Sequence, residues 1–271
     1  MSAFMPPAPL PVANPALPTM YDLPSGKHPE EPGLPDEFHD FQPQLLSQTF
    51  RPLAFPPDRI FTATDLNLYY DPQRPRYYKR PDWFAVVDVP RIVDRGRLSY
   101  VIWQEQQVPI VVVELLSPNT IEEDQGLTLR DRQPPSKWEV YESILRIPNY
   151  VLFDRTGNSL QIYRLQAGRY QLQSEDRLWL EELGIGLSLW QGTFEGFTRQ
   201  WLRWYDIEGR WIPCEAEKTE LERQRAEQAE RIAQEERLRA EQAERIIAEE
   251  RRRAQAMAER LRALGIDPDA L

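Results

Sequence analysis

The sequence has little of the chemistry that cysteine and histidine provide. Its 271 residues include one cysteine, Cys214, and two histidines, His28 and His39. A single cysteine excludes an internal disulfide and a zinc site made of several thiolates. Because both histidines lie in the N-terminal segment, far in sequence from the acidic motifs described below, a histidine-based zinc site or catalytic triad has little support.

Other signals are also missing. No apolar run approaches the length of a membrane span, and no Lys/Arg region followed by an apolar core opens the chain, so we expect a cytoplasmic protein without membrane contact. A Gly-rich phosphate-binding loop is absent. The formal net charge of −10 argues against a protein that coats nucleic acid, because such proteins are usually basic. An enzyme that meets nucleic acid through a local basic patch or bound cations remains compatible with this charge.

The composition divides the chain into three parts. Residues 1–50 begin with a Pro-rich segment, which predicts an extended arm, and continue into a short helix near Phe38–Gln48 with Asp36 as its N-cap. Residues 51–213 have the pattern of an α/β (α+β) domain with a mixed sheet. Residues 214–271 are rich in Glu, Arg and Ala, and they predict a long charged helix.

Seven strands are predicted in the central part, from short apolar or alternating runs bounded by Pro, Gly, Asn and Asp. Two of them, Trp83–Val89 and Ile110–Leu116, are apolar on both faces, which is typical of central strands covered on both sides. A helix follows at Ser136–Arg146, where Ser136 and Glu139 form a capping box. The full set of predicted strands is Leu66–Tyr70, Trp83–Val89, Leu98–Trp103, Ile110–Leu116, Tyr150–Asp154, Ser159–Arg164 and Arg169–Gln173.

The charged C-terminal segment contains an internal repeat. From Glu215 to about Leu264 there is neither glycine nor proline, and AEQAERI occurs at Ala226 and again at Ala240, two heptads later. A ladder of mostly alanine positions, spaced alternately three and four residues apart, favours a self-associating coiled coil. A single solvated helix held by Glu–Arg pairs four residues apart is the alternative. Gly265 is the expected end of the helix.

Glu114 lies in the stretch IVVVELLSPN, where it interrupts an otherwise apolar strand. An ionised carboxylate in a core costs several kcal/mol unless it is paired, hydrogen-bonded, protonated or bound to a metal. Pairing with backbone N–H groups, or with Arg130 or Arg132, is a purely structural explanation. The functional explanation is a site shared with Asp82, which stands directly after Pro81 at the mouth of a neighbouring strand.

The two carboxylates of Asp82 and Glu114 suit a hard divalent cation. Mg²⁺ takes oxygen ligands, commonly one or two carboxylates together with waters and phosphate oxygens. Lys137 and Tyr141 lie four residues apart on one face of the following helix. A lysine beside the cation can orient or deprotonate a water, or stabilise charge on a phosphate. Metal-assisted hydrolysis of a phosphodiester uses all of these groups, and the acidic loop Glu122–Asp124 is a further candidate contributor.

Three segments carry a resemblance to a known family. RPDWFAVVDVP, PIVVVELLSPNT and KWEVYESILRIPNYVLFD occur in an order and at spacings that resemble the Uma-two family of restriction-endonuclease-like proteins, which is abundant in cyanobacteria and is placed in the PD-(D/E)XK nuclease superfamily. The resemblance covers about Leu66 to Gln173. It implies a restriction-endonuclease-like mixed β-sheet core flanked by helices. It also implies metal ligands at Asp82 and Glu114, one Mg²⁺ or Mn²⁺ ion, and DNA as the substrate.

One position departs from the superfamily pattern. The superfamily lysine would fall at Leu116, and the resemblance gives its role to Lys137, with Tyr141 completing a helical Lys-x-x-x-Tyr motif. The first hypothesis is therefore a metal-dependent DNA endonuclease that dimerises, through the nuclease domain or the C-terminal helix, so that two active sites address two strands. The second hypothesis, favoured by Leu116 and the acidic net charge, is a catalytically inactive nuclease-fold scaffold that uses the helix for assembly or partner binding.

Overall fold

The computed structural model describes residues 17–19, 37–116, 125, 135–155 and 157–263. The chain forms two compact units, residues 1–214 and residues 215–271. Most of the predicted Pro-rich arm, the predicted N-cap Asp36 and the predicted helix end at Gly265 lie outside the described residues. Among the helices that the structure describes, none is long and apolar enough to cross a membrane.

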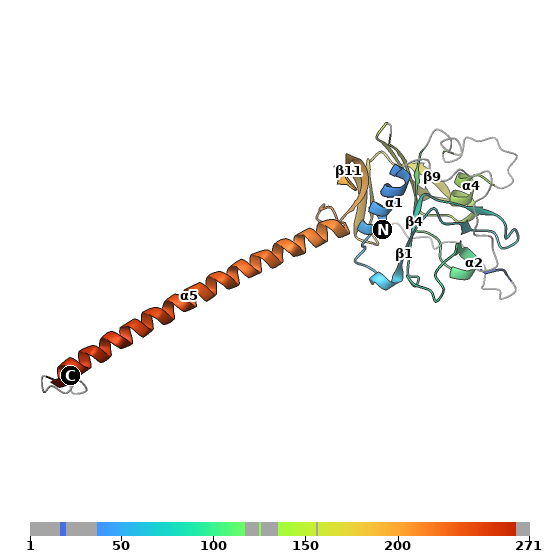
Figure 1. Cartoon of the computed structure of the whole chain (residues 1–271). Coiled ribbons are helices and arrows are strands. Elements are labelled where there is room, and N and C mark those ends of the chain that lie inside the picture. The colour runs from blue at the N-terminus through green and yellow to red at the C-terminus, as the bar shows by residue number, and fades with distance from the viewer. Residues whose placement is uncertain (1–16, 20–36, 117–124, 126–134, 156, 264–271) are drawn as a thin grey trace. The chain divides into compact units, whose positions relative to one another are not determined.

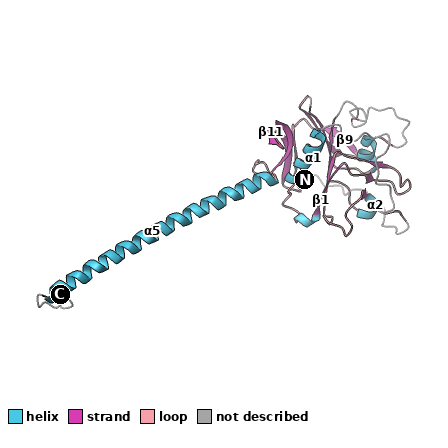
Figure 2. Ribbon diagram, in the orientation of Figure 1, coloured by secondary structure: helices cyan, strands magenta, loops and turns pink. Residues whose placement is uncertain are grey.

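A six-stranded mixed sheet is the centre of the first unit (Figures 1 and 2). Its order is β1-β4-β6-β7-β8-β9, in which β6 and β7 are parallel and the other neighbouring pairs are antiparallel. This mixed sheet, with its helices and the long C-terminal helix, confirms the predicted fold class. The strands are β1 (Ile60–Thr64), β4 (Trp83–Val87), β6 (Val111–Leu115), β7 (Asn149–Asp154), β8 (Ser159–Gln166) and β9 (Arg169–Leu172).

Two three-stranded sheets and several short helices complete the first unit. The sheet β3-β2-β5 consists of β3 (Tyr78–Lys79), β2 (Leu68–Tyr69) and β5 (Tyr100–Val101). The antiparallel sheet β10-β11-β12 consists of β10 (Arg177–Leu180), β11 (Ile185–Phe194) and β12 (Phe197–Tyr205). The helical elements are α1 (Glu37–Thr49), the 3-10 turn η1 (Pro57–Arg59), α2 (Ile102–Glu105), α4 (Lys137–Glu139) and the π-helical turn η2 (Val140–Ile144), which continues α4.

The central strands are buried on both faces, as their sequences predict. In β6, Val113 and Leu115 belong to the apolar cluster shared with α1 and the sheet β10-β11-β12. Val112, and Leu116 just after the strand, belong to the apolar cluster on the other face of the sheet, which includes residues of η2. Because successive side chains of a strand point to opposite faces, Glu114 falls on the side of α4. Figure 1 shows α1 and α4 on opposite sides of the sheet.

Some elements differ from the prediction. The predicted strand Leu98–Trp103 is wrong beyond Val101, because the chain turns into α2 and Trp103 is helical. Gln106, with a left-handed φ of 59°, ends that helix after one turn. The predicted strand Leu66–Tyr70 is reduced to β2, whose two residues pair with β3 and β5. β1 and the strands β10, β11 and β12 are not among the seven predicted strands.

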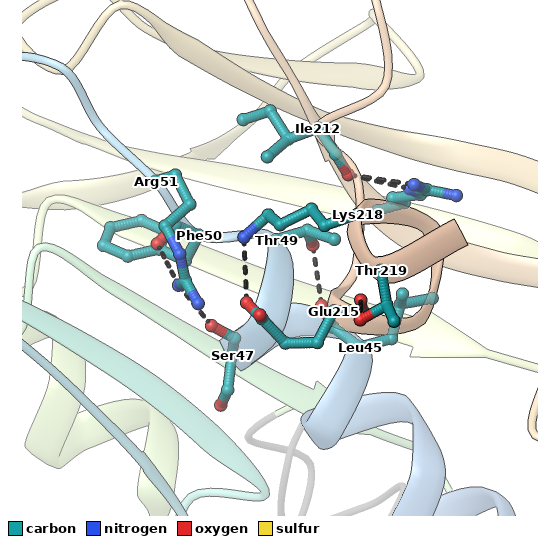
Figure 3. Close-up of polar contacts among 10 residues, drawn as sticks. Leu45, Ser47, Thr49, Phe50, Arg51, Ile212, Glu215, Lys218 and Thr219 are labelled. Carbon is teal, nitrogen blue, oxygen red and sulfur yellow. Dashed lines mark hydrogen bonds and ion pairs between the residues drawn. The ribbon is translucent and has the colours of Figure 1, made fainter. Parts of the chain in front are cut away.

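Helix α1 is attached to β12 by one buried side chain. The amide of Gln42 donates to the Leu202 carbonyl at 2.9 Å and accepts from the Leu202 N–H at 2.8 Å. At the other end of α1, the Arg51 guanidinium donates to the carbonyl of Ser47 at 2.8 Å, which satisfies one of the terminal carbonyls (Figure 3). Since β12 is an edge strand, the Leu202 backbone groups would otherwise lack a partner within the sheet.

We expect Gln42→Leu to lower the free energy of unfolding by about 2–3 kcal/mol, because it leaves the buried N–H and carbonyl of Leu202 unsatisfied. The matched control is Gln44→Leu, since Gln44 lies on the same helix and donates to the Asp40 carboxylate at the surface. This change should alter stability by less than about 0.5 kcal/mol. Urea unfolding followed by circular dichroism measures both values, and equal effects would contradict the docking role of Gln42.

The second unit consists of one described helix, α5 (Glu215–Ala263), which is 49 residues long. In its first turn, Lys218 pairs with Glu215 at 2.8 Å and the Thr219 hydroxyl donates to the Glu215 carbonyl (Figure 3). Where the structure describes them, the side chains of α5 are largely exposed. A 49-residue helix has a length of about 74 Å at 1.5 Å per residue.

Candidate active site

The pairing of β4 with β6 brings the two predicted acidic residues together. The antiparallel register places Trp83 opposite Val113 and Phe84 opposite Val112, so Asp82, one residue further along, falls opposite Glu114. The Asp82 N–H donates to Glu114 Oε2 at 3.2 Å. The Asp82 carboxylate in turn accepts from the Leu115 N–H at 2.6 Å. The Glu114 carboxylate thus contacts the backbone of Asp82, and the Asp82 carboxylate contacts the backbone of the residue after Glu114, so both carboxylates are held at the same end of two neighbouring strands.

The helical segment that begins at Ser136 supplies the other two predicted residues. The Ser136 hydroxyl accepts from the Glu139 N–H at 3.2 Å, which confirms the predicted N-cap. From this helical start, the Lys137 ammonium donates to Glu114 Oε2 at 2.9 Å. The Tyr141 hydroxyl donates to Glu114 Oε1 at 3.0 Å. Lys137 and Tyr141 thus share a face, as their spacing predicts, and both contact the same carboxylate.

Burial determines how strongly these groups interact. Glu114 is fully buried, and the Lys137 side chain is 14% exposed. A carboxylate removed from water is destabilised unless an opposite charge and hydrogen bonds replace its hydration, and Glu114 has three such donors. Lys137 is at the edge of this cluster and keeps a solvent-facing part. It is the member of the pair that can reach a molecule arriving from outside.

Aromatic packing fixes the helical segment over the sheet. Trp138 makes edge-to-face contacts with Tyr150, Tyr163 and Tyr170 at centroid distances of 4.9–5.8 Å. Burial raises the pKa of Tyr170 well above its usual range, and the nearby Glu142 carboxylate adds to the rise, so the phenol stays neutral. Its hydroxyl donates to a backbone carbonyl, that of residue 147, at 3.0 Å. This packing holds Lys137 and Tyr141 in place, one on each side of Trp138 in the sequence.

A second buried glutamate supports the same segment without belonging to the cluster. Glu142, on η2, accepts from the Arg169 guanidinium at 2.9 Å and from the Tyr170 N–H at 2.7 Å. Both donors belong to β9, so Glu142 fastens η2 to that strand. Its role is that of a structural carboxylate, which makes it a natural comparison for Glu114.

His39 is a neighbour of the site that sequence reasoning dismissed. Its Nε2 atom lies 3.1 Å from the carbonyl oxygen of Leu115, the residue after Glu114, and the imidazole is buried. Next to it on α1, Phe38 lies under the guanidinium groups of Arg155 and Arg199. The early position of His39 in the chain suggested distance from the carboxylates, but α1 packs across the sheet and removes that distance. No local sequence signal would have revealed this contact.

Several predicted contributors lie outside the described residues, namely Glu122, Glu123, Asp124, Arg130 and Arg132. Arg130 and Arg132 were the candidate structural partners of Glu114. In the described part of the chain, the cation that pairs with Glu114 is Lys137.

The oxygen atoms of Asp82 and Glu114 are the candidate ligands of a divalent cation. Within the described residues there is no group of three or more His, Cys, Asp or Glu side chains that could hold a metal. Asp82 and Glu114 are two carboxylates at one end of adjacent strands, and this number suits Mg²⁺, which keeps several waters and takes its remaining ligands from a substrate. Both side chains offer oxygen ligands alone, whereas zinc sites typically contain thiolate and imidazole ligands. The residues present therefore fit Mg²⁺ or Mn²⁺.

Comparisons with known proteins agree with the resemblance in sequence. The family model Uma2, described as "Putative restriction endonuclease", matches residues 15–193. Among curated proteins, none matches the chain. Among solved structures, the chain is similar to the crystal structure of a putative nuclease belonging to DUF820 from Anabaena variabilis, with 15% identity and a TM-score of 0.27. That similarity covers 45% of this chain and 58% of the other, so the chain spans little more than half the length of that structure.

Proposed function

Because the chain belongs to the Uma2 family of restriction-endonuclease-like proteins, we propose that it is a metal-dependent endonuclease that hydrolyses phosphodiester bonds in DNA. The observation that carries the proposal is the convergence of Asp82, Glu114, Lys137 and Tyr141 in one cluster. Two carboxylates opposite each other on adjacent strands, with a lysine ammonium 2.9 Å from one of them, form a set whose members can all act on a phosphodiester.

Each residue has a distinct role in this proposal. Asp82 and Glu114 would hold one Mg²⁺ or Mn²⁺ ion, which when bound activates water as a nucleophile and neutralises charge on the phosphate. Lys137, through its exposed edge, orients the attacking water or donates to a phosphate oxygen. Tyr141 fixes the orientation of Glu114 by donating to Oε1. The Leu115 N–H does the same for Asp82.

The test is metal-dependent cleavage by the full chain. Supercoiled plasmid, linear duplex and single-stranded DNA are incubated with the protein in Mg²⁺, in Mn²⁺, and after chelation with EDTA. We expect cleavage that disappears with EDTA, returns with excess Mg²⁺, and is at least about 100-fold slower in Asp82→Asn, because that change removes one ligand charge. Absence of metal-dependent cleavage of all three substrates, or equal rates for Asp82→Asn and the unmodified chain, would contradict the proposal.

A second function is favoured by a different observation. Leu116 occupies the position of the superfamily lysine, and Glu114 is fully buried with both oxygens already accepting hydrogen bonds. A nuclease-fold scaffold without catalysis would have these properties, and it would use α5 for assembly or partner binding. The same plasmid assay separates the two functions, since the scaffold cleaves nothing whatever metal is supplied. Both functions are compatible with a homodimer that forms through the first unit or through α5.

A further inference from the structure

Helix α5 exposes large apolar side chains in a regular arrangement. Four of them, Leu221, Ile232, Ile246 and Met257, are 44–63% exposed and follow one another at intervals of 11, 14 and 11 residues. The whole interval is 36 residues, which is ten turns at about 3.6 residues per turn, and each step is close to a whole number of turns. The four side chains therefore lie on one straight line along the helix. We call the α5 seam the strip of helix surface, about 100° wide in total, that contains this line and extends mainly to one side of it.

The charges inside the seam are not distributed evenly. At about 100° per residue, five charged side chains fall within it, namely Lys218, Arg225, Glu236, Arg239 and Glu250. The two nearest the N-terminal end are basic, and the one nearest the C-terminal end is acidic. If two copies of α5 were parallel and in register, each charge would meet its own copy, and like charges in such a contact repel. An antiparallel pair would instead bring the basic end of one helix to the acidic end of the other.

Ion pairs within α5 leave most seam charges available. Along the described helix, ion pairs reach two seam residues: Lys218 pairs with Glu215 at 2.8 Å, and Arg239 lies 3.9 Å from Glu235. The pairs among Glu220, Arg223 and Glu227, and between Glu249 and Arg253, lie outside the seam. Among the described residues, none forms an ion pair with Arg225, Glu236 or Glu250. In a single solvated helix stabilised by intrahelical ion pairs, nothing explains why these three charges lie on the apolar face without intrahelical partners.

We propose that α5 binds a second copy of itself in antiparallel orientation, in a single register set by these charges. When Arg225 is placed opposite Glu250 of the second copy, Glu236 falls opposite Arg239 of the second copy without further adjustment. Twofold symmetry repeats both contacts, so the interface has four complementary pairs. The remaining seam charge, Lys218, faces Met257 of the second copy, where its aliphatic part can cover the thioether while the ammonium stays in water.

The same register also matches side-chain size. Three of the four large apolar residues that define the seam fall opposite an alanine of the second copy, which lets the two helix axes approach closely. The charge pairs and the size match involve different residues, so the size match is independent support for the register. The facing pairs are Leu221 with Ala254, Ile232 with Ala243, and Ile246 with Ala229.

This arrangement has a geometric consequence. In the proposed register, the N-terminal ends of the two α5 helices, at Glu215 of each copy, are about 68 Å apart along the common axis. The first units of the two copies would then be joined to the helix pair at these two separated points. The inference itself concerns assembly, and it does not rest on the proposed nuclease activity.

The orientation can be tested with cysteine pairs in the full chain. Cys214 is buried, so the oxidised parent protein serves as the background. An Ala229→Cys chain is mixed with an Ile246→Cys chain carrying a tag of different mass, and the mixture is oxidised. We expect the mixed disulfide to exceed either homodisulfide by about tenfold, because only facing positions satisfy disulfide geometry. Predominant homodisulfides would indicate a parallel pair and would overturn the proposal, as would a monomeric parent at about 100 μM in sedimentation equilibrium.

The register can be tested by charge exchange. We expect Arg225→Glu to raise the dimer dissociation constant about tenfold, because it faces Glu250 of the second copy twice per dimer. The double change Arg225→Glu/Glu250→Arg should restore the parent value, because opposite charges then face each other again. In a parallel pair in register, each change replaces one like-charge contact with another, so the single change would not weaken the dimer. The matched control is Arg252→Glu. Arg252 lies seven and a half turns from Arg225 and is therefore on the opposite face of the helix. Both arginines have a Glu three residues before them and a Gln three residues after them.

Sedimentation equilibrium measures all four dissociation constants, and circular dichroism checks that the helix content is unchanged. Failure of the double change to restore dimerisation, or an equal loss in the Arg252 control, would overturn the register. Neither result would bear on metal-dependent cleavage, which is measured separately with the same proteins.

Discussion

Replacing Lys137 with methionine is expected to lower the free energy of unfolding by about 3 kcal/mol, because it leaves the fully buried Glu114 carboxylate without its counter-charge. Methionine keeps most of the length and apolar volume of the lysine, so a packing defect contributes little. Tyr141 and the Asp82 N–H would still donate to Glu114, but two neutral donors do not replace an ammonium at 2.9 Å. The measurement is urea unfolding followed by tryptophan fluorescence.

Tryptophan fluorescence is well suited to this experiment, since all eight tryptophans precede Glu215 and report on the first unit alone. Two further variants sharpen it. Lys137→Met/Glu114→Gln should recover most of the lost stability, because the buried charge is then gone. Arg59→Met removes a pair of similar length, 2.8 Å to Asp88, whose side chains are 40% and 58% exposed, and should cost less than about 1 kcal/mol. Additive losses in the double variant would show that the two side chains do not depend on each other.

The candidate site could be predicted because its residues are unusual in their local sequence. Glu114 breaks an apolar strand, Asp82 stands at the mouth of another, and the distance between Lys137 and Tyr141 is one helical turn. What the sequence could not provide was the register of β4 against β6. That register decides whether Asp82 falls opposite Glu114, and a shift of one residue would have turned the glutamate to the other face of the sheet.

The part of the site near α1 could not be predicted, for a related reason. Whether His39 approaches Leu115 depends on how α1 lies across the sheet, which is a property of packing between elements 76 residues apart. Similarly, β10, β11 and β12 were missed because their burial is only partial: in β11 a run from Ser188 to Thr193 is half-buried or exposed, which gives a weak apolar signal. The β11–β12 hairpin is nevertheless marked by Glu195-Gly196, both with positive φ in its turn.

The helical segment of α4 and η2 illustrates how a correct prediction can lack detail. The capping box at Ser136 correctly located its start, but the π-helical turn at Val140–Ile144 widens the helix after one turn. Such turns insert an extra residue into the helical ladder and are frequent at functional sites. The widened turn still leaves Tyr141 on Glu114 while Glu142 reaches β9, so consecutive residues serve the candidate site and the structural anchor.

Glu114 and Glu142 are both buried and paired with a cation, so they can be compared directly. Glu114→Gln is expected to abolish metal-dependent DNA cleavage, with a loss of about 10³-fold or more, because the amide cannot supply the negative charge that a divalent cation requires. Glutamine has the same shape, and its carbonyl oxygen can still accept from Tyr141 or Lys137, so the fold should persist.

Glu142→Gln is the matched control. Glu142 is also buried and also paired with a cation, but its partner is Arg169 on β9. We expect that control to lose some stability and to cleave within about threefold of the parent rate. Initial rates of plasmid cleavage at saturating Mg²⁺ measure both variants, with unfolding curves recorded on the same samples. If both variants cleave equally fast, Glu114 is a structural carboxylate like Glu142, and its pairing with Lys137 serves only to keep a charge buried between α4 and the sheet.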